Sequence, residues 1–322
     1  MSAARDWAEL LRLPALFTVP GDALAGAATT GLRPNRRTLL AIGSSLCLYE
    51  AGMALNDWAD RAEDAVERPE RPLPSGRIAP PAALTAAVAL TATGLTLAAR
   101  AGRPSLVVAG ALAGTVWGYD LGLKHTSAGP TAMAAARGLD LLLGATATAG
   151  RGHAPGARAA APSAAVLAAH TLAVTEVSRH EAQGGSSATP LAALAATTAL
   201  GHVVGRGGRR VSLRRGGEFQ QGMGSGPEPR RGNGPYPRPG TAPQVLRAGL
   251  ALAYVGTTAK PLFHAVLNPS PPLTQRAVGG GIRAMIPLQA ALSARAGAVG
   301  TALLTAALAP AARKFARKVS VT

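Results

Sequence analysis

Long apolar stretches with few charged residues are the feature that most constrains this chain. They include residues 82–99, 131–149, 161–177 and 191–204, and Ala and Gly dominate them. A helix needs about 20 consecutive apolar residues to cross the hydrocarbon layer of a membrane. A soluble helix of this kind would need a charged face at helical spacing, which most of these stretches lack. The sequence therefore predicts a polytopic membrane protein.

Nine stretches are predicted to be transmembrane helices, at approximately residues 12–30, 38–56, 81–99, 105–121, 130–150, 161–178, 190–205, 244–262 and 284–309. Their small residues allow helix backbones to approach closely, as in packed membrane bundles. The expected fold class is all-α, a polytopic transmembrane helical bundle of about nine helices. We expect one domain over residues 1–322, with Pro14 and Pro20 kinking the first helix.

Residues 205–243 interrupt this pattern between the seventh and eighth predicted helices. Gly, Arg and Pro dominate the segment, and such a composition cannot bury enough apolar surface to fold. We expect a disordered loop insertion here. A nucleic-acid-binding tail is the other interpretation of this segment.

The formal net charge of +17 does not indicate a nucleic-acid partner for the chain as a whole. Outside the loop insertion, most Lys and Arg residues lie at the ends of apolar stretches, where lipid headgroups would meet them. Only 3% of residues are aromatic, which leaves few rings for stacking on bases. The single cysteine, Cys47, excludes a disulfide within the chain. The expected partner is the lipid bilayer of the cell membrane, and no obligatory protein partner can be inferred.

Acidic residues are concentrated directly after the second predicted helix. Six of the 16 acidic residues fall between Asp57 and Glu70. Spacings of three, four and seven residues place Asp57, Asp60 and Asp64 on one face of a helix. Carboxylates this close repel one another, and a hard divalent cation with oxygen ligands would relieve the repulsion. Asn56, Asp57, Asp60 and Asp64 are therefore predicted to bind Mg²⁺; a solvated loop is the alternative, because arginines are interleaved with these acids.

The segment that follows reads RPERPLPSGRI over residues 68–78. Together with the N-D-x-x-D-x-x-x-D pattern that starts at Asn56, it resembles the first motif of the UbiA superfamily of intramembrane prenyltransferases, and most of all its EboC-like branch. The resemblance extends weakly over the chain outside residues 205–243. It implies a bundle with a central cavity, where an isoprenyl diphosphate binds through Mg²⁺ and a hydrophobic acceptor attacks the allylic carbocation. It also implies an acidic motif on the cytoplasmic side, which the loop charges do not decide.

The same resemblance assigns roles to several basic residues. It implies that Arg71 and Arg77 face the diphosphate, as the guanidinium suits bidentate recognition of oxygens; headgroup contact or a pairing with Glu70 is the alternative. Tyr119 and Lys124 resemble the family's Tyr/Lys element. In that role Lys124 would bind diphosphate and Tyr119 would shield or orient the carbocation, whereas an interfacial Tyr with a snorkelling Lys is the ordinary explanation.

Charged and polar residues also occur inside predicted spans. Arg137 and Asp140 lie three residues apart on one helical face, and charges within a membrane tend to face a cavity or to pair together. Arg137 is predicted either to bind diphosphate or to form a structural pair with Asp140. Gln289 is predicted to make a helix–helix hydrogen bond.

The family's second acidic motif, an Asp pair four residues apart, is degenerate in this chain. Glu181 occupies the position of the second acid, and Val177 occupies that of the first, with Glu176 one residue away. Glu181 is predicted to be a further metal ligand. Glu176 and His180 are weaker candidates.

The sequence thus predicts a Mg²⁺-dependent membrane prenyltransferase that moves an isoprenyl group from a polyprenyl diphosphate to a lipophilic or aromatic acceptor. The degenerate second motif supports an alternative, a catalytically altered relative that serves export or assembly of a lipophilic metabolite. An ordinary transporter would be expected to contain internal repeats, and none is convincing here. Donor length and acceptor do not follow from the sequence.

Overall fold

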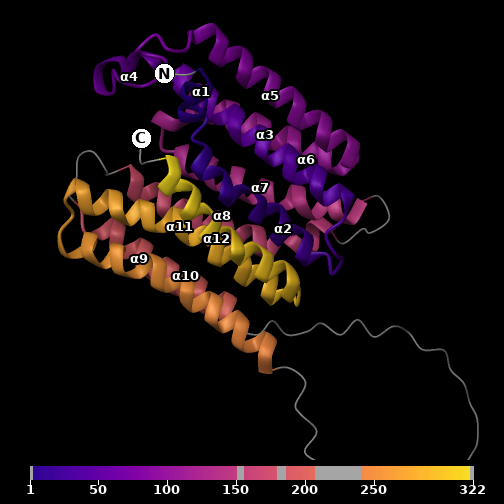
Figure 1. Cartoon of the computed structure of the whole chain (residues 1–322). Helices are drawn as coiled ribbons and strands as arrows, with labels where there is room; N and C mark the ends of the chain where they lie inside the picture. The colour runs from indigo at the N-terminus through magenta and orange to yellow at the C-terminus, as the bar shows by residue number, and fades with distance from the viewer. Residues whose placement is uncertain (1–2, 151–155, 180–185, 207–240, 320–322) are drawn as a thin grey trace, which may run out of the picture.

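The computed structural model describes residues 3–150, 156–179, 186–206 and 241–319, and every regular element in these ranges is a helix. The long helices run side by side, and α1 lies at the same end of the bundle as the end of α12 (Figure 1). The all-α prediction is confirmed. The elements are α1 (Ala3–Leu10), η1 (Leu13–Thr18), α2 (Val19–Thr29), α3 (Arg36–Ala59), α4 (Arg61–Glu67), α5 (Pro80–Ala101), α6 (Arg103–Leu121), η2 (Leu123–His125), α7 (Gly129–Ala149), α8 (Gly156–Ser178), α9 (Ala188–Gly205), α10 (Thr241–Leu267), α11 (Pro271–Arg295) and α12 (Val299–Val319).

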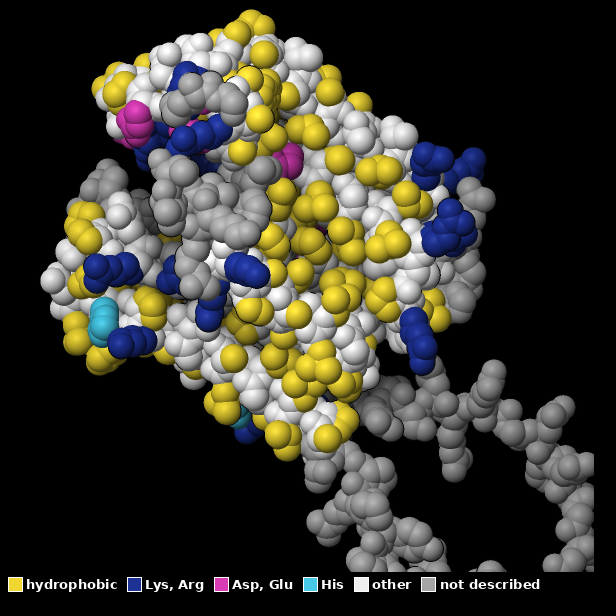
Figure 2. Space-filling model, in the orientation of Figure 1, with side chains coloured by type: hydrophobic (Ala, Val, Ile, Leu, Met, Phe, Trp, Pro, Cys, Tyr) yellow, Lys and Arg dark blue, Asp and Glu magenta, His cyan; other side chains and the backbone are white. Residues whose placement is uncertain are grey.

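Several of these helices have the length and composition of membrane spans. Five qualify by both criteria within the described residues: α3, α5, α8, α9 and α10. Hydrophobic side chains cover the middle of the face in Figure 2, while Lys and Arg side chains lie mostly toward its edges. This distribution is typical of multi-pass membrane proteins. The predicted number of nine spans stays a prediction.

Helix ends follow local sequence signals. Proline lies in the first turn of α2, α5, α6, α7 and α11, where the helix needs no N–H from it. Asn35 caps α3, since its side chain accepts from the backbone N–H groups of Arg37 and Thr38 while the Thr38 hydroxyl accepts from the Asn35 N–H. This reciprocal arrangement satisfies N–H groups that the helix leaves unpaired.

The last predicted span is wrong in one respect. Residues 284–309 comprise the end of α11 and the start of α12, and the two helices are separated at residues 296–298, where Gly297 has a φ of 85°. Glycine adopts this conformation without steric cost. Apolar composition continues across the break, so hydropathy does not reveal it. The predicted helix at 12–30 likewise begins as η1 before α2, and the short helix α1 was not predicted. The helix expected to continue through Asp64 is present as a separate helix, α4.

Helices α2 and α7 cross at the centre of the bundle with close backbone contact. A Cβ on Gly144 would lie 2.4 Å from a Cα of α2, and one on Gly26 would lie 2.0 Å from the carbonyl oxygen of Leu141. A methyl group fits at neither position, so the two backbones touch, as small residues permit in membrane bundles. This contact brings Asp22 on α2 within reach of Arg137 on α7.

The predicted loop insertion at 205–243 overlaps the last residue of α9 and the first three residues of α10, and the rest of it lies between these helices. Residues 207–240 lie outside the described residues, so its disorder stays a prediction.

Candidate functional site

A cavity of about 510 Å³ lies between α3, α6, α7, α8 and α11, a volume typical of small-molecule sites. Its middle wall is largely apolar, with Leu48, Leu112, Val116 and Val174 among the residues that line it. We call one polar end the mouth, lined by Arg12, Asn56, Tyr119 and Asp120. We call the other the floor, lined by Thr18, Ser45, Arg137, Asp140 and His170.

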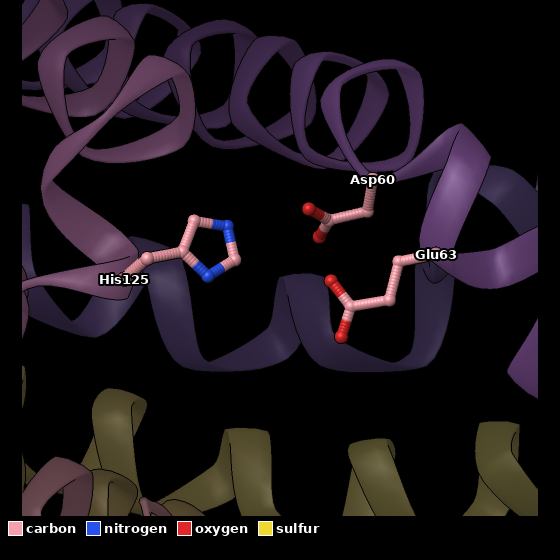
Figure 3. Close-up of side chains that lie close together, drawn as sticks. All are labelled: Asp60, Glu63 and His125. Atoms are coloured by element: carbon pink, nitrogen blue, oxygen red, sulfur yellow. The ribbon is translucent and has the colours of Figure 1, made fainter.

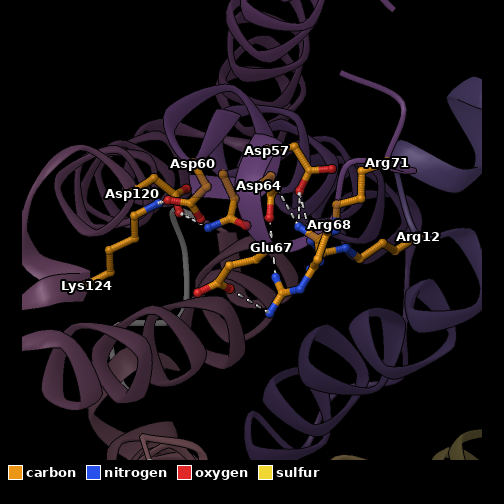
Figure 4. Close-up of polar contacts among 10 residues, drawn as sticks. Arg12, Asp57, Asp60, Asp64, Glu67, Arg68, Arg71, Asp120 and Lys124 are labelled. Atoms are coloured by element: carbon orange, nitrogen blue, oxygen red, sulfur yellow. Dashed lines mark hydrogen bonds and ion pairs between the residues drawn. The ribbon is translucent and has the colours of Figure 1, made fainter. Parts of the chain in front are cut away.

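The ends of α3 and α6 place one polar pair at the mouth and a second pair beside it. The Lys124 ammonium donates to the Asp60 carboxylate, and Asn56 Nδ2 donates to Asp120 Oδ1 at 3.2 Å (Figure 4). Asp120 is 4% exposed, and Tyr119 beside it lines the same end of the cavity. The structure therefore brings together four residues predicted from the sequence, Asn56, Asp60, Tyr119 and Lys124, and adds Asp120.

The other two aspartates of the motif pair with arginines. Helix α3 ends one residue before Asp60, where φ is −86° and ψ is 2°, so the expected continuous helix is interrupted before α4. Arg12 Nη2 donates to Asp57 Oδ1 at 2.8 Å, and Arg71 Nη1 donates to Asp64 Oδ2 at 2.7 Å. Arg71 also lies 3.7 Å from Asp57 Oδ1. Side-chain cations thus compensate the repulsion among these carboxylates (Figure 4).

Arg77 lies outside this cluster. Its guanidinium donates to Asp6 Oδ1 at 2.5 Å and Glu9 Oε2 at 2.8 Å on α1, and to the carbonyl oxygen of Glu70 at 2.6 Å. The hydrogen bonds that Arg77 donates to Glu9, and to a smaller extent to Asp6, stabilise its charged form and raise its pKa. This placement supports a structural role, in which Arg77 ties α1 to the loop after α4.

Arg137 lies at the floor, and its ion-pair partner is Asp22. Arg137 Nη1 donates to Asp22 Oδ2 at 2.5 Å, and Nη2 donates to the Thr18 hydroxyl at 3.2 Å. The predicted Arg137–Asp140 pair is therefore wrong as the main pairing. Asp140 instead accepts a hydrogen bond from the Ser45 hydroxyl across the interface between α3 and α7. Both contacts lie well inside the bundle.

Two further side chains connect helices at the floor. Gln289 Nε2 donates to Asp22 Oδ1 at 2.6 Å, which is the helix–helix hydrogen bond expected for this residue. His170 Nε2 lies 3.1 Å from the Gly281 carbonyl oxygen, and the Tyr254 hydroxyl lies 2.9 Å from Nδ1. A carbonyl oxygen can only accept, so Nε2 carries the proton and Nδ1 accepts from Tyr254.

Only part of the second acidic motif lies among the described residues. Glu181 and His180 lie outside the described residues. Val177, at the position of the first acid, is buried in an apolar cluster with Ala193 and Leu262. Glu176 lies on α8 and is half-buried. In the described part of this motif, an apolar residue, Val177, therefore replaces the first acid of the family's pair.

One group of candidate metal ligands occurs among the described residues. Ligand atoms of Asp60, Glu63 and His125 lie within 4.8 Å of one another (Figure 3). Mg²⁺ takes oxygen ligands and keeps several waters, sharing a few carboxylates with substrate phosphates, whereas imidazole suits transition metals. The carboxylates of Asp60 and of the exposed Glu63, with the amide oxygen of Asn56 one turn before Asp60, fit Mg²⁺. The residues present at the mouth therefore match this cation by donor chemistry.

Three charged residues of the cavity region were not predicted as site residues: Arg12, Asp22 and Asp120. Arg12 reaches Asp57 from 45 positions earlier in the chain, which no local pattern reveals. Asp22 is an isolated acid in an apolar stretch, and that rarity is a usable signal, because a membrane charge needs a partner. Asp120 directly follows Tyr119, so the predicted Tyr/Lys element already contained it.

This is a multi-pass membrane protein whose helices enclose a cavity with a charged mouth, an arrangement suited to a lipophilic ligand with a polar head. The model of the UbiA prenyltransferase family matches residues 15–203, which is more than half of the chain. The chain belongs to the UbiA prenyltransferase family.

Curated relatives match over shorter regions. A digeranylgeranylglyceryl phosphate synthase from Methanothrix thermoacetophila is 39% identical over 104 residues, covering 31% of this chain and 39% of the relative. Another from Ignicoccus hospitalis is 34% identical, covering 45% and 48%. A protoheme IX farnesyltransferase from Acidiphilium cryptum is 37% identical, covering 37% and 38%. The chain thus spans less than half the length of these relatives.

Solved structures show the same fold over nearly the whole chain. A UbiA homolog from Archaeoglobus fulgidus, bound to GPP and Mg²⁺, superposes with a TM-score of 0.58 at 18% identity, covering 91% of this chain and 99% of that one. An apo UbiA homolog from Aeropyrum pernix K1 gives 0.58 at 16% identity, covering 86% and 96%. At these identities the likeness establishes the fold alone.

Proposed function

We propose that this protein transfers an isoprenyl group from a prenyl diphosphate to a lipophilic or aromatic acceptor within the membrane, and that it requires Mg²⁺. The observation that carries the proposal is the cluster of Asn56, Asp60, Asp120 and Lys124 at one end of a cavity whose middle wall is apolar. A charged head and a hydrocarbon tail need these two environments side by side. The Archaeoglobus structure with GPP and Mg²⁺ supports the same use of the fold.

Asn56 and Asp60 are the residues we assign to the metal. Mg²⁺ bound there would draw negative charge from the departing diphosphate. Asp57 and Asp64, also predicted as ligands, each accept hydrogen bonds from arginine. We infer that these two acids orient Arg12 and Arg71 toward the mouth and do not bind the metal directly. Glu181 stays a predicted ligand.

Lys124 is the main candidate for holding the diphosphate. Its side chain is only 8% exposed and already pairs with Asp60, so its charge is held close to the proposed metal position. An ammonium can share three donors between the carboxylate and phosphate oxygens. Arg71, 24% exposed at its side chain, can turn a guanidinium edge to the diphosphate in the same way. We do not assign Arg77 to the diphosphate, because its guanidinium pairs with Asp6 and Glu9 on α1.

The cavity wall suits the reactive end of the donor. When the allylic C–O bond breaks, its electron pair leaves with the diphosphate and the carbon becomes positive. The aliphatic side chains below the mouth exclude water that would capture this carbon. Tyr119 lines the mouth, and its ring face can stabilise a nearby cation. This is the shielding role that the resemblance to the family's Tyr/Lys element implies for it.

The acceptor that this protein uses is a question for experiment. Digeranylgeranylglyceryl phosphate synthases and a protoheme farnesyltransferase both match this chain, and their names imply different acceptors. Membership of the EboC-like branch and a cytoplasmic position for the acidic motif stay predictions.

Release of diphosphate from geranyl and farnesyl diphosphate by the detergent-purified protein, in the presence of lipophilic and aromatic acceptors, tests the proposal. We expect release with Mg²⁺ and none after chelation. Asp60→Asn should abolish it, while Glu67→Gln, a half-exposed acid of the same segment, should retain it. The proposal fails if the wild-type protein binds no prenyl diphosphate in the presence of Mg²⁺.

The second candidate is a catalytically altered relative that serves export or assembly of a lipophilic metabolite. The observation that favours it is the buried, apolar Val177 where the family places an acid. This candidate predicts tight Mg²⁺-dependent binding of the donor without diphosphate release. The assay above separates the two functions directly.

A further inference from the structure

A second hollow, of about 650 Å³, lies at the end of the bundle opposite the mouth. Helix α3 begins at this end and reaches the mouth at its other end. The hollow is formed by the end of α2 and the loop after it, together with the junction of α11 and α12. Its lining is mostly Ala and Gly, and Arg33 and Thr301 are its polar side chains. It is therefore separate from the cavity described above.

The first turn of α12, at the edge of this hollow, has no side-chain cap. Helices commonly begin after Ser, Thr, Asp or Asn, whose side chain accepts from the first free N–H groups. Here the preceding residue is Ala298. The backbone N–H groups of Gly300 and Thr301 have no acceptor among the described residues. Such N–H groups carry the partial positive charge of a helix N-terminus, and they suit a phosphate oxygen.

The side chain of Thr301 gives a second, independent indication of a ligand. Thr301 lines the hollow and is only 8% exposed, and its hydroxyl makes no hydrogen bond within the part of the chain that the structure describes. One turn later, the Thr305 hydroxyl donates to the Thr301 carbonyl oxygen, as threonines in these helices commonly do. A buried hydroxyl without a partner costs free energy. A ligand oxygen in the hollow would accept its proton.

The charges at this end of the bundle are of one sign. Arg33 is exposed and takes part in no ion pair of the described residues. In and beside the connections α2–α3, α5–α6 and α11–α12 there is no Asp or Glu, and the arginines there are Arg33, Arg36, Arg37, Arg100, Arg103 and Arg295. On the face shown in Figure 2, Lys and Arg side chains gather at the right-hand edge, where no acidic side chain is visible. An anion is attracted here, and an ammonium group finds no carboxylate.

The position of the hollow fits a lipid better than a free ion. It lies beside the start of α3, which has the length and composition of a membrane span, and the ends of such spans lie at the level of the headgroups. On the next turn of α12, Leu304 lines the hollow and is 55% exposed, and Leu303 beside it is 53% exposed. Exposed leucines at this depth offer a surface for an acyl chain.

We propose that this hollow binds the phosphate of an anionic phospholipid through Arg33, the Thr301 hydroxyl and the free N–H groups of α12, with an acyl chain against Leu304. The rest of the headgroup is uncharged, as in phosphatidylglycerol, because a choline or ethanolamine ammonium would lie among arginines without a carboxylate. The bound lipid joins the α2–α3 loop to the start of α12. This inference is independent of the proposed function.

Native mass spectrometry of the full-length protein in detergent, titrated with phosphatidylglycerol or phosphatidylcholine, tests the proposal. We expect phosphatidylglycerol to bind about ten-fold tighter than phosphatidylcholine. Arg33→Gln should weaken binding of phosphatidylglycerol about ten-fold, since it removes a charged donor to the phosphate. The matched control is Arg100→Gln, which removes the same charge from the same end of the bundle but outside the hollow. It should leave the affinity within about two-fold of the wild-type value.

Two further variants separate binding from folding. A Cβ at Gly300 meets nothing within 4 Å, so Gly300→Glu fits without a clash. Its carboxylate favours the helix N-terminus and repels a phosphate. We therefore expect an unchanged or higher melting temperature together with loss of phosphatidylglycerol binding. Thr301→Val removes the hydroxyl at nearly constant shape and should weaken binding, whereas Thr301→Ser should restore it.

Three results would overturn the proposal. Equal affinity for the two lipids would remove the headgroup preference. Equal weakening by Arg33→Gln and Arg100→Gln, or no weakening by Arg33→Gln, would show that the attraction is diffuse and not confined to the hollow. Displacement of bound phosphatidylglycerol by inorganic phosphate would identify the hollow as a site for the free ion. None of these results bears on diphosphate release at the mouth.

Discussion

The mouth and the floor of the cavity both pair carboxylates with cations, yet they bury these groups to different degrees. At the mouth, Asp57 and Asp64 are buried and have arginine partners that reach in from the surface: the side chains of Arg12 and Arg68 are 40% and 51% exposed. The neighbouring Asp60–Lys124 pair is itself mostly buried, with side chains 21% and 8% exposed. At the floor Asp22 is fully buried and the side chain of Arg137 is 15% exposed.

This difference determines which pairs a ligand can exchange. A half-exposed arginine is partly hydrated and flexible, so a diphosphate or a metal ion can compete for its partner at little cost. The Asp22–Arg137 pair is enclosed by α2, α7 and α11, and opening it would leave a charge unpaired in an apolar interior. The mouth is therefore suited to binding and release, and the floor to a fixed shape.

The strongest test of this contrast is Asp22→Ala. It should destabilise the protein by about 3–5 kcal/mol, because Arg137 loses its carboxylate inside the bundle. Asp57→Ala at the mouth should cost clearly less, since Arg12 can return to solvent. Unfolding in mixed SDS micelles measures both. Equal losses for the two variants would remove the distinction between the ends.

A second test concerns the close packing of α2 against α7, which brings Asp22 near Arg137 at the floor. Gly144→Ala places a methyl group against the α2 backbone and should cost about 1–3 kcal/mol, as overpacking does. The control is Gly110→Ala, since a Cβ at Gly110 meets nothing within 4 Å. It should be neutral or slightly stabilising, because alanine favours the helix. The same unfolding assay applies, and a neutral Gly144→Ala would contradict the close crossing of α2 and α7.

Lys124→Ala should separate binding from stability at the mouth. We expect an unfolding free energy lowered by about 1 kcal/mol and an affinity for geranyl diphosphate, with Mg²⁺ present, lowered about ten-fold. Lys124→Arg keeps the charge and should recover part of that affinity. Calorimetry of donor binding provides the measurement. An unchanged affinity in Lys124→Ala would exclude Lys124 from the diphosphate site.

The smallest effect is expected for Arg77→Gln. Its partners Asp6 and Glu9 lie on the short helix α1, and a pair near solvent contributes about 1 kcal/mol or less. Donor affinity should stay at the wild-type value, because Arg77 does not reach the mouth. A large loss of donor affinity would restore the diphosphate role that the motif suggested for this residue.

Much of the fold could be predicted because hydropathy and small residues are local properties. The ranges 81–99 and 105–121 correspond to α5 and α6 with an error of two residues or fewer at each end. The break at Gly297 was not predicted, because a single glycine among apolar residues gives no sequence signal of a positive φ. The short helix α1 was not predicted because it is amphipathic and does not span a membrane.

The site was predictable where its residues are close in sequence. Asn56 and Asp60 are four positions apart, and Tyr119 and Lys124 are five, so each pair was visible as a motif. What joins them is the packing of α3 beside α6, which the sequence does not display. The partner of Arg137 was missed for the same reason: Asp140 is near in the chain, while Asp22 is near in space.

The hydrogen bonds of His170 have a consequence for side reactions. An allylic carbocation is readily deprotonated by a neighbouring base, and elimination to a diene then competes with transfer. The lone pair of His170 on Nδ1 is directed at the Tyr254 hydroxyl and away from the cavity's contents. The imidazole of His170 therefore connects helices through its hydrogen bonds and does not act as a base toward a molecule in the cavity.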